Sequence, residues 1–213
     1  QLAMKIGHID AIISMASESH VDRSIEFPAA FVANNVQLIL NLLEYHRTYV
    51  PDAIFLQVST DEVYGPAPEE HNHVEWETFL PSNPYSASKA AQESIAFSYW
   101  RTFKTPLILT NTMNIIGERQ DPEKFVPMVI KKVLDGDTVT IHASPEGKPG
   151  SRYYLHARNQ ADALVHLLKV YMGHDIENAG DGANYYISRT IEQLKGEGES
   201  LIYENELVRP PKF

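Results

Sequence analysis

The sequence predicts an α/β fold in which a doubly wound parallel sheet carries a small α+β region. Two observations predict it. Near-continuous apolar segments of strand length alternate with long segments of helical periodicity along residues 10–112, which is the pattern of βαβ units. The apolar segments lack polar alternation, as expected where helices cover both faces of a parallel sheet.

The elements of the first region follow from their periodicity. In the first long helix, Phe31, Asn35, Leu38, Leu42 and Tyr45 recur at three- and four-residue steps, and Pro51 and Asp52 end the pattern. A polar turn is expected at residues 18–22. Strands are expected at 10–17, 53–59 and 105–112, and helices at 28–49 and 85–103.

The pattern changes after Gly117, and we expect a smaller α+β region from there on. A helix at 125–136 is ended by Gly136, because glycine adopts the left-handed conformation that closes a helix. Beyond it we expect a strand at 138–143, a loop at 144–150, a helix at 157–173 and a strand at 183–188. Residues 189–213 are assigned no element. The chain is thus divided into regions 1–118 and 119–213.

Composition and charge exclude several classes of function. The chain has 213 residues, 43% of them hydrophobic, and 18 Lys and Arg against 28 Asp and Glu, for a net charge of −10. So acidic a protein is not expected to bind nucleic acid or an anionic membrane. The absence of cysteine excludes disulfides, thiolate metal sites and cysteine nucleophiles and suits a reducing compartment, so we expect a cytoplasmic protein and no metal site.

Tyr85 and Lys89 form the first candidate site. They are four residues apart near the start of a predicted helix, so their side chains share one face. An ammonium near a phenol favours the ionised form and lowers a pKa that is ordinarily about 10. The pair can then take a proton from a hydroxyl group near neutral pH. Taken alone, this spacing also fits an ordinary solvated helix face.

Thr60, Asp61 and Glu62 follow the second predicted strand directly. The carboxyl end of a strand is where open α/β sheets bind ligands. A hydroxyl and two carboxyl groups there provide a hydrogen-bond donor, an acid and a base. The alternative is a polar turn without a catalytic role.

Three further segments carry polar residues at strand or helix ends. Residues 17–25 follow the first strand, and a capped loop before a helix would explain them equally well. Asn114 follows the third strand, and the Arg152 guanidinium could hold a diphosphate.

In combination, these segments resemble the extended short-chain dehydrogenase/reductase superfamily, and within it the nucleotide-sugar 4,6-dehydratases. The Thr-Asp-Glu triplet separates these dehydratases from sugar epimerases, which share Tyr-x-x-x-Lys. The resemblance spans about residues 8–188 and implies a Rossmann-type sheet. Its motifs are ESHVDRSI (18–25), STDEVYG (59–65), NPYSASKAAQE (83–93), TNTMNIIG (110–117) and PEKFVPMVI (122–130).

The resemblance implies an NAD-dependent lyase with five catalytic residues. Tyr85, its pKa lowered by Lys89, takes the proton of the sugar 4-hydroxyl, and Thr60 hydrogen-bonds the same oxygen. Glu62 removes the C5 proton, and Asp61 protonates the leaving 6-hydroxyl. The product is a 4-keto-6-deoxy sugar, and NAD is regenerated in each cycle.

The resemblance also implies the binding residues and the assembly. Ala16, Ser17 and Ser19 line the NAD site together with Tyr85 and Lys89. The nucleotide sugar, an NDP-hexose with dTDP-glucose as the first candidate, is faced by His20, Asn114, Lys124 and Arg152. The protein is expected to form a homodimer through a four-helix bundle of helices 28–49 and 85–103.

One departure from the superfamily leaves alternatives open. The G-x-x-G-x-x-G turn that seats the pyrophosphate is absent, and only Gly7 precedes Gly65. We therefore expect an incomplete sheet, entered just before its fourth strand, as part of a longer intact enzyme. The alternatives are an epimerase of the same superfamily or a truncated, non-catalytic protein that binds nucleotide sugars or acts as a scaffold.

Overall fold

The computed structural model describes residues 7–67, 71, 73–173 and 185–187. The chain forms two compact units, one of residues 1–112 with 171–213 and the other of residues 113–170. None of the described helices is long and apolar enough to cross a membrane.

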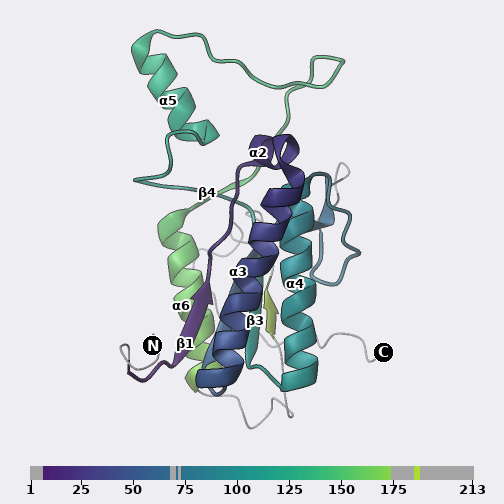
Figure 1. Cartoon of the computed structure of the whole chain (residues 1–213). Coiled ribbons are helices and arrows are strands. Elements are labelled where there is room, and N and C mark those ends of the chain that lie inside the picture. Colours follow the sequence, from purple (N-terminus) through teal and green to yellow (C-terminus); the bar gives the residue numbers. More distant parts are fainter. Residues whose placement is uncertain (1–6, 68–70, 72, 174–184, 188–213) are drawn as a thin grey trace. The chain divides into compact units, whose positions relative to one another are not determined.

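The first unit contains a sheet of four strands in the order β1-β2-β3-β6 (Figure 1). All neighbouring strands are parallel, which confirms the predicted α/β class. Each predicted strand of the sheet is present, with ends that differ by a few residues. The bounds are β1 (Ala11–Ser14), β2 (Ile54–Thr60), β3 (Leu107–Thr112) and β6 (Tyr185–Ile187).

Two long helices pack side by side against this sheet (Figure 1). They are α3 (Pro28–Tyr49) and α4 (Pro84–Phe103), and both lie within one residue of the prediction. The core between helices and sheet is a cluster of Ile39, Leu43, Phe55, Ala96 and Leu107. Burying each of its larger side chains contributes about 1.5–3 kcal/mol.

Local sequence fixes where α4 begins and ends. The Asn83 side chain accepts a hydrogen bond from the Ser86 N–H at 2.9 Å, and the Ser86 hydroxyl accepts one from the Asn83 N–H at 3.2 Å. This capping box satisfies two backbone donors, and Pro84 stands where a missing N–H costs nothing. At the other end Lys104 is left-handed, with φ of 60°. The cap places Tyr85 in the first turn of the helix.

The second unit contains two helical segments and a small sheet. β4 (Asn114–Ile116) pairs in parallel with β5 (Tyr154–His156). α5 (Phe125–Asp135) ends at a left-handed Gly136, as predicted. α6 (Ala157–Gly173) starts in this unit, and its last residues belong to the first unit.

The prediction of a strand at 138–143 is wrong. The segment is irregular apart from an isolated bridge between Ala143 and Pro149. Ile141, one of the alternating apolar residues, is 58% exposed, so the segment does not present a packed apolar face. Alternation alone does not make a strand when no neighbouring strand is there to pair with it.

Three short elements were missed by the sequence analysis. The expected polar turn at 18–22 leads directly into a helix, α2 (Val21–Glu26). β4 and β5 have three residues each, too few for periodicity to reveal. The segment 189–213, which was assigned no element, lies outside the described residues.

Candidate active site

The carboxyl ends of the parallel strands bring the predicted catalytic segments of the first unit to one edge of the sheet. β2 ends at Thr60 and leads into a 3₁₀ turn, η1 (Asp61–Tyr64). In the β2–β3 register, Thr60 lies opposite Thr112. Ligands bind at this edge in open α/β sheets.

Thr60 organises the turn that carries the two carboxyl groups. Its hydroxyl oxygen accepts a hydrogen bond from the Glu62 N–H at 3.3 Å and caps the turn. The same hydroxyl donates to Asp61 Oδ1 at 3.2 Å. It also hydrogen-bonds the Tyr85 phenol. Tyr85 therefore lies beside the Thr-Asp-Glu triplet, although more than twenty residues separate them in the chain.

The environment of Tyr85 overturns one expectation. Burial, with the nearby Glu62 carboxylate, raises the pKa of Tyr85 to about 12, while the hydrogen bond between Thr60 and the phenol lowers it. Asp61 adds a further small rise. The expected lowering of the Tyr85 pKa by Lys89 is wrong in this structure, because burial and two carboxylates outweigh any cationic influence.

Lys89 is buried and is held by a hydrogen bond to strand β2. Its Nζ donates to the Val58 carbonyl at 2.8 Å, and the residue is only 4% exposed. Burial lowers the pKa of Lys89 to about 8, while the charge of Glu93 opposes the change. One of its three ammonium donors is used by Val58, so the group retains donors for a ligand.

A buried carboxyl group beneath Lys89 was missed by the sequence analysis. Glu93 Oε1 accepts hydrogen bonds from the Ser59 hydroxyl and from Asn111 Nδ2, the latter at 2.8 Å. Burial raises the pKa of Glu93 to about 7, although Ser59, Asn111 and Lys89 each lower it. The four-residue spacing of Lys89 and Glu93 was the available signal.

Asn35 was also missed, although it stands in the otherwise apolar stripe of α3. Its side chain accepts from the Glu18 N–H at 2.8 Å and donates to the Glu18 carbonyl at 3.0 Å and to the Ser88 hydroxyl at 2.8 Å. Asn35 is fully buried. It therefore fixes the loop after β1 to both long helices. The sequence signal for this role was a polar residue at a core position of a helix.

The loop that Asn35 anchors carries the residues expected to line the NAD site. Ala16 and Ser19 are exposed, while Ser17 and His20 are partly buried. The Ser17 hydroxyl donates to the Glu18 carbonyl at 3.0 Å. Hydroxyls, a phenol and an ammonium at one sheet edge form a donor set that fits the ribose and amide groups of NAD.

The remaining predicted substrate residues lie in the second unit. Asn114 begins β4, and Lys124 stands at the N-terminus of α5. The exposed Arg152 donates from Nη1 to the Ser151 carbonyl at 2.9 Å. We predicted that these three residues act together with His20 of the first unit, and this stays a prediction.

Comparison with known proteins identifies the family of the chain. The model of the NAD dependent epimerase/dehydratase family matches residues 1–180. The chain belongs to this family. The turn at Thr60-Asp61-Glu62 and the Tyr85–Lys89 pair are therefore set in an epimerase/dehydratase fold.

Individual members of the family are similar over most of the chain. A dTDP-glucose 4,6-dehydratase of Xanthomonas campestris pv. campestris is 43% identical over 163 residues, which are 73% of this chain and 46% of that protein. The low-salt glycan biosynthesis protein Agl12 of Haloferax volcanii is 34% identical over 189 residues, 89% of this chain and 59% of that protein. The chain thus spans about half the length of these curated relatives.

A solved structure agrees with this placement. DesIV, the dTDP-glucose 4,6-dehydratase of Streptomyces venezuelae crystallised with NAD bound, superposes with a TM-score of 0.73 at 31% identity. The match covers 92% of this chain and 58% of that one. The Rossmann-type sheet implied by the sequence is confirmed by this similarity.

Proposed function

We propose that the protein is an NAD-dependent nucleotide-sugar 4,6-dehydratase, a lyase that converts an NDP-hexose to its 4-keto-6-deoxy derivative, with dTDP-glucose as the substrate. The observation that carries the proposal is the contact of the Thr60-Asp61-Glu62 turn with the Tyr85 phenol. A hydroxyl, a phenol and two carboxyl groups at one sheet edge can perform oxidation and water loss on neighbouring carbons of one sugar. The similarity to dTDP-glucose 4,6-dehydratases supports it.

Each side chain has one task in the proposed reaction. Tyr85 accepts the proton of the sugar 4-hydroxyl, and Thr60 orients the same oxygen through its own hydroxyl. The ketone formed at C4 acidifies the C5 proton, which the Glu62 carboxylate removes. The Asp61 carboxyl group protonates the departing 6-hydroxyl, and water leaves. The C4 hydride that bound NAD would hold then returns to C6, and C5 regains a proton, which gives the 4-keto-6-deoxy sugar.

The role of Tyr85 depends on a change in its pKa. With a pKa of about 12, the phenol is protonated at neutral pH and is a poor base. When bound, NAD⁺ supplies the hydride acceptor and a cationic ring, and a cation favours phenolate. We propose that Ala16, Ser17, Ser19, Tyr85 and Lys89 hold it.

The remaining parts of the proposal concern the substrate and the assembly. His20, Asn114, Lys124 and Arg152 would face the nucleotide sugar, with the guanidinium of Arg152 on its diphosphate. A homodimer would form through α3 and α4, which already pack on each other within one chain. The expected cytoplasmic location stays a prediction.

The test of the function is an assay with dTDP-glucose and NAD⁺. We expect a 4-keto-6-deoxy product, followed by its absorbance in alkali. Glu62→Gln removes the base for C5 but leaves the groups at O4, so it should abolish water loss yet still reduce bound NAD⁺. A single-turnover measurement of NADH absorbance detects that arrest.

Asp52→Asn is the matched control. This carboxylate precedes β2 at its amino end and is exposed, so water loss should continue at the wild-type rate. A 4-epimer without the keto product would favour the epimerase alternative. No reaction and no reduction of NAD⁺ would favour the non-catalytic binding protein.

A further inference from the structure

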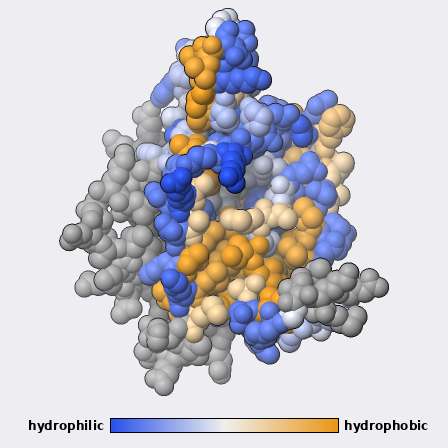
Figure 2. Space-filling view, turned by 90° about the vertical axis from the view of Figure 1, so that its left-hand side faces the viewer, coloured by the Kyte–Doolittle hydropathy of each residue, from blue (hydrophilic) through white to orange (hydrophobic). Residues whose placement is uncertain are grey.

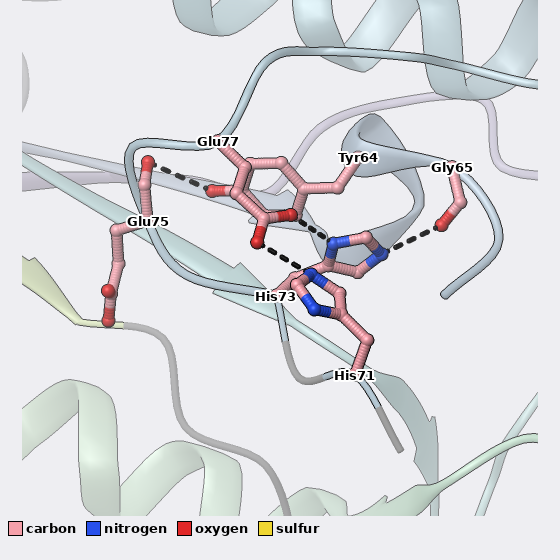
Figure 3. A network of polar contacts seen from close by, with 6 residues as sticks. All are labelled: Tyr64, Gly65, His71, His73, Glu75 and Glu77. Carbon is pink, nitrogen blue, oxygen red and sulfur yellow. Dashed lines mark hydrogen bonds and ion pairs between the residues drawn. The ribbon is translucent and has the colours of Figure 1, made fainter. Parts of the chain in front are cut away.

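Three side chains with metal-binding atoms converge in the segment between η1 and α4 (Figure 3). His71, His73 and Glu77 offer two imidazole nitrogens and a carboxylate, with ligand atoms all within 4.8 Å of one another. His71 Nε2 lies 2.7 Å from Glu77 Oε1, and His73 Nδ1 contacts Glu77 Oε2. One carboxylate thus faces a ring nitrogen with each of its oxygens.

The ring of His73 has a backbone carbonyl beside one nitrogen and a carboxylate beside the other. Nε2 lies 3.2 Å from the Gly65 carbonyl, which can only accept, so Nε2 carries the hydrogen. In the neutral ring, Nδ1 then carries a lone pair, which points at the carboxylate of Glu77. A metal ion bound by both Nδ1 and the Glu77 carboxylate would lie where these two acceptor atoms meet.

We propose that His71, His73 and Glu77 form a binding site for a divalent transition metal ion, with Zn²⁺ as the best match. Two imidazoles and one carboxylate are a common zinc ligand set, which leaves a fourth position for water. The hydrogen bond from His73 Nε2 to the Gly65 carbonyl is the outer contact that orients a metal-bound histidine.

The geometry allows an ion to enter with a small adjustment. Zinc–ligand bonds of about 2 Å in a tetrahedron set ligand atoms roughly 3.3 Å apart. The His71–Glu77 contact must therefore widen by about half an ångström, and the shorter His73–Glu77 contact by more than that. His71 is 46% exposed in its side chain, which gives the ion a path from solvent and leaves the ring able to move.

The same cluster is connected to the catalytic turn. The Tyr64 ring lies 5.3 Å from the His73 ring, and its hydroxyl donates to the Glu75 carbonyl at 3.2 Å. Tyr64 is the last residue of η1, which begins with Asp61 and Glu62. A metal here would therefore fix the segment after the turn. The proposed metal site does not depend on the proposed dehydratase reaction, and that reaction does not need the metal.

Metal binding by the purified, chelator-treated protein tests the proposal directly. Equilibrium dialysis against Zn²⁺ should give one ion bound per chain at this site. His71→Ala, His73→Ala and Glu77→Gln should each weaken binding at least about tenfold. Co²⁺ in place of Zn²⁺ should produce the visible absorption of tetrahedral cobalt, and His71→Ala should remove it.

His8→Ala is the matched control, because His8 Nε2 pairs with Asp10 at 3.1 Å without a second histidine, in side chains that are 85% and 63% exposed. It should bind zinc as the wild type does. His71 is largely in solvent, so His71→Ala keeps its fold, and unchanged far-ultraviolet circular dichroism verifies this. Wild-type zinc affinity in His71→Ala, or no zinc binding by the wild type, would overturn the proposal.

Discussion

At the scale of single residues, the buried carboxyl group of Glu93 makes stability depend on pH. Its pKa is raised to about 7 from an ordinary 4.5, and burial is the main cause. The folded chain therefore holds a proton between pH 4.5 and 7 that the unfolded chain has released. The linkage relation makes stability fall as pH rises through this window, by up to about 3 kcal/mol.

Glu93→Gln tests that dependence, because glutamine has the same shape and no charge to bury. Urea unfolding at several pH values should show the wild type losing stability relative to the variant as pH rises from 4.5 to 7. Above that range the difference should stay constant. Parallel stability curves for the two proteins would show that Glu93 titrates normally.

Asn35 and Asn34 are neighbours in α3, and we expect their alanine variants to differ strongly in stability. Asn35→Ala removes three hydrogen bonds from a fully buried site, so unfolding free energy should fall by about 3 kcal/mol. NAD affinity should fall too, because Glu18 lies in the loop expected to line that site. Asn34 makes only an exposed contact to Glu18 at 3.2 Å, and its alanine variant should change stability by less than about 0.5 kcal/mol. Equal losses in the two variants would contradict the anchoring role of Asn35.

At the scale of elements, Gly65 joins the turn η1 to the segment that follows. Its φ is +82°, and a Cβ there would lie 2.4 Å from the Leu80 carbonyl oxygen. Gly65→Ala adds backbone strain of about 1–3 kcal/mol and forces two backbone segments apart. Thermal unfolding should show it less stable than Gly147→Ala, since Gly147 has a φ of +81° but open space around it. Equal melting temperatures would mean that the close approach to Leu80 carries no cost.

At the scale of the whole molecule, two surfaces are candidates for the proposed self-association. β1 pairs only with β2 among the described strands, and Ile13 within it is 45% exposed. Figure 2 shows apolar side chains gathered on one face of the molecule. Exposed edge strands pair readily with other chains. The helix pair is the other candidate surface, and at one end of it Arg47 stacks on the Phe103 ring at 5.1 Å.

The proposed dimer through the helices and an association through the edge strand β1 give different results in sedimentation. A dimer through α3 and α4 should persist in Ile13→Lys. It should dissociate when the exposed ends of both helices are charged, as in Tyr49→Glu with Phe103→Glu. These side chains are 60% and 48% exposed, so the fold should tolerate both changes. Sedimentation of the wild type at monomer mass would contradict the dimer.

The sequence by itself determined the long elements and indicated the candidate catalytic side chains. Helical and strand periodicity is a local property, so α3, α4 and the strands of the main sheet were predicted closely. Motif spacing likewise indicated Thr60, Asp61, Glu62 and Tyr85. At 138–143 the alternation of apolar residues predicted a strand that does not form. A strand needs a neighbouring strand to pair with, and the alternation of residues does not reveal whether one is there.

Only the tertiary structure decided how these side chains are tuned. Spacing along one helix predicted that Lys89 lowers the Tyr85 pKa, yet burial and carboxylates from another segment raise it. Asn35 and Glu93 gain their roles from partners 17 or more residues away in the chain. Burial and electrostatic energy depend on what the fold brings together, and no window of sequence contains that information.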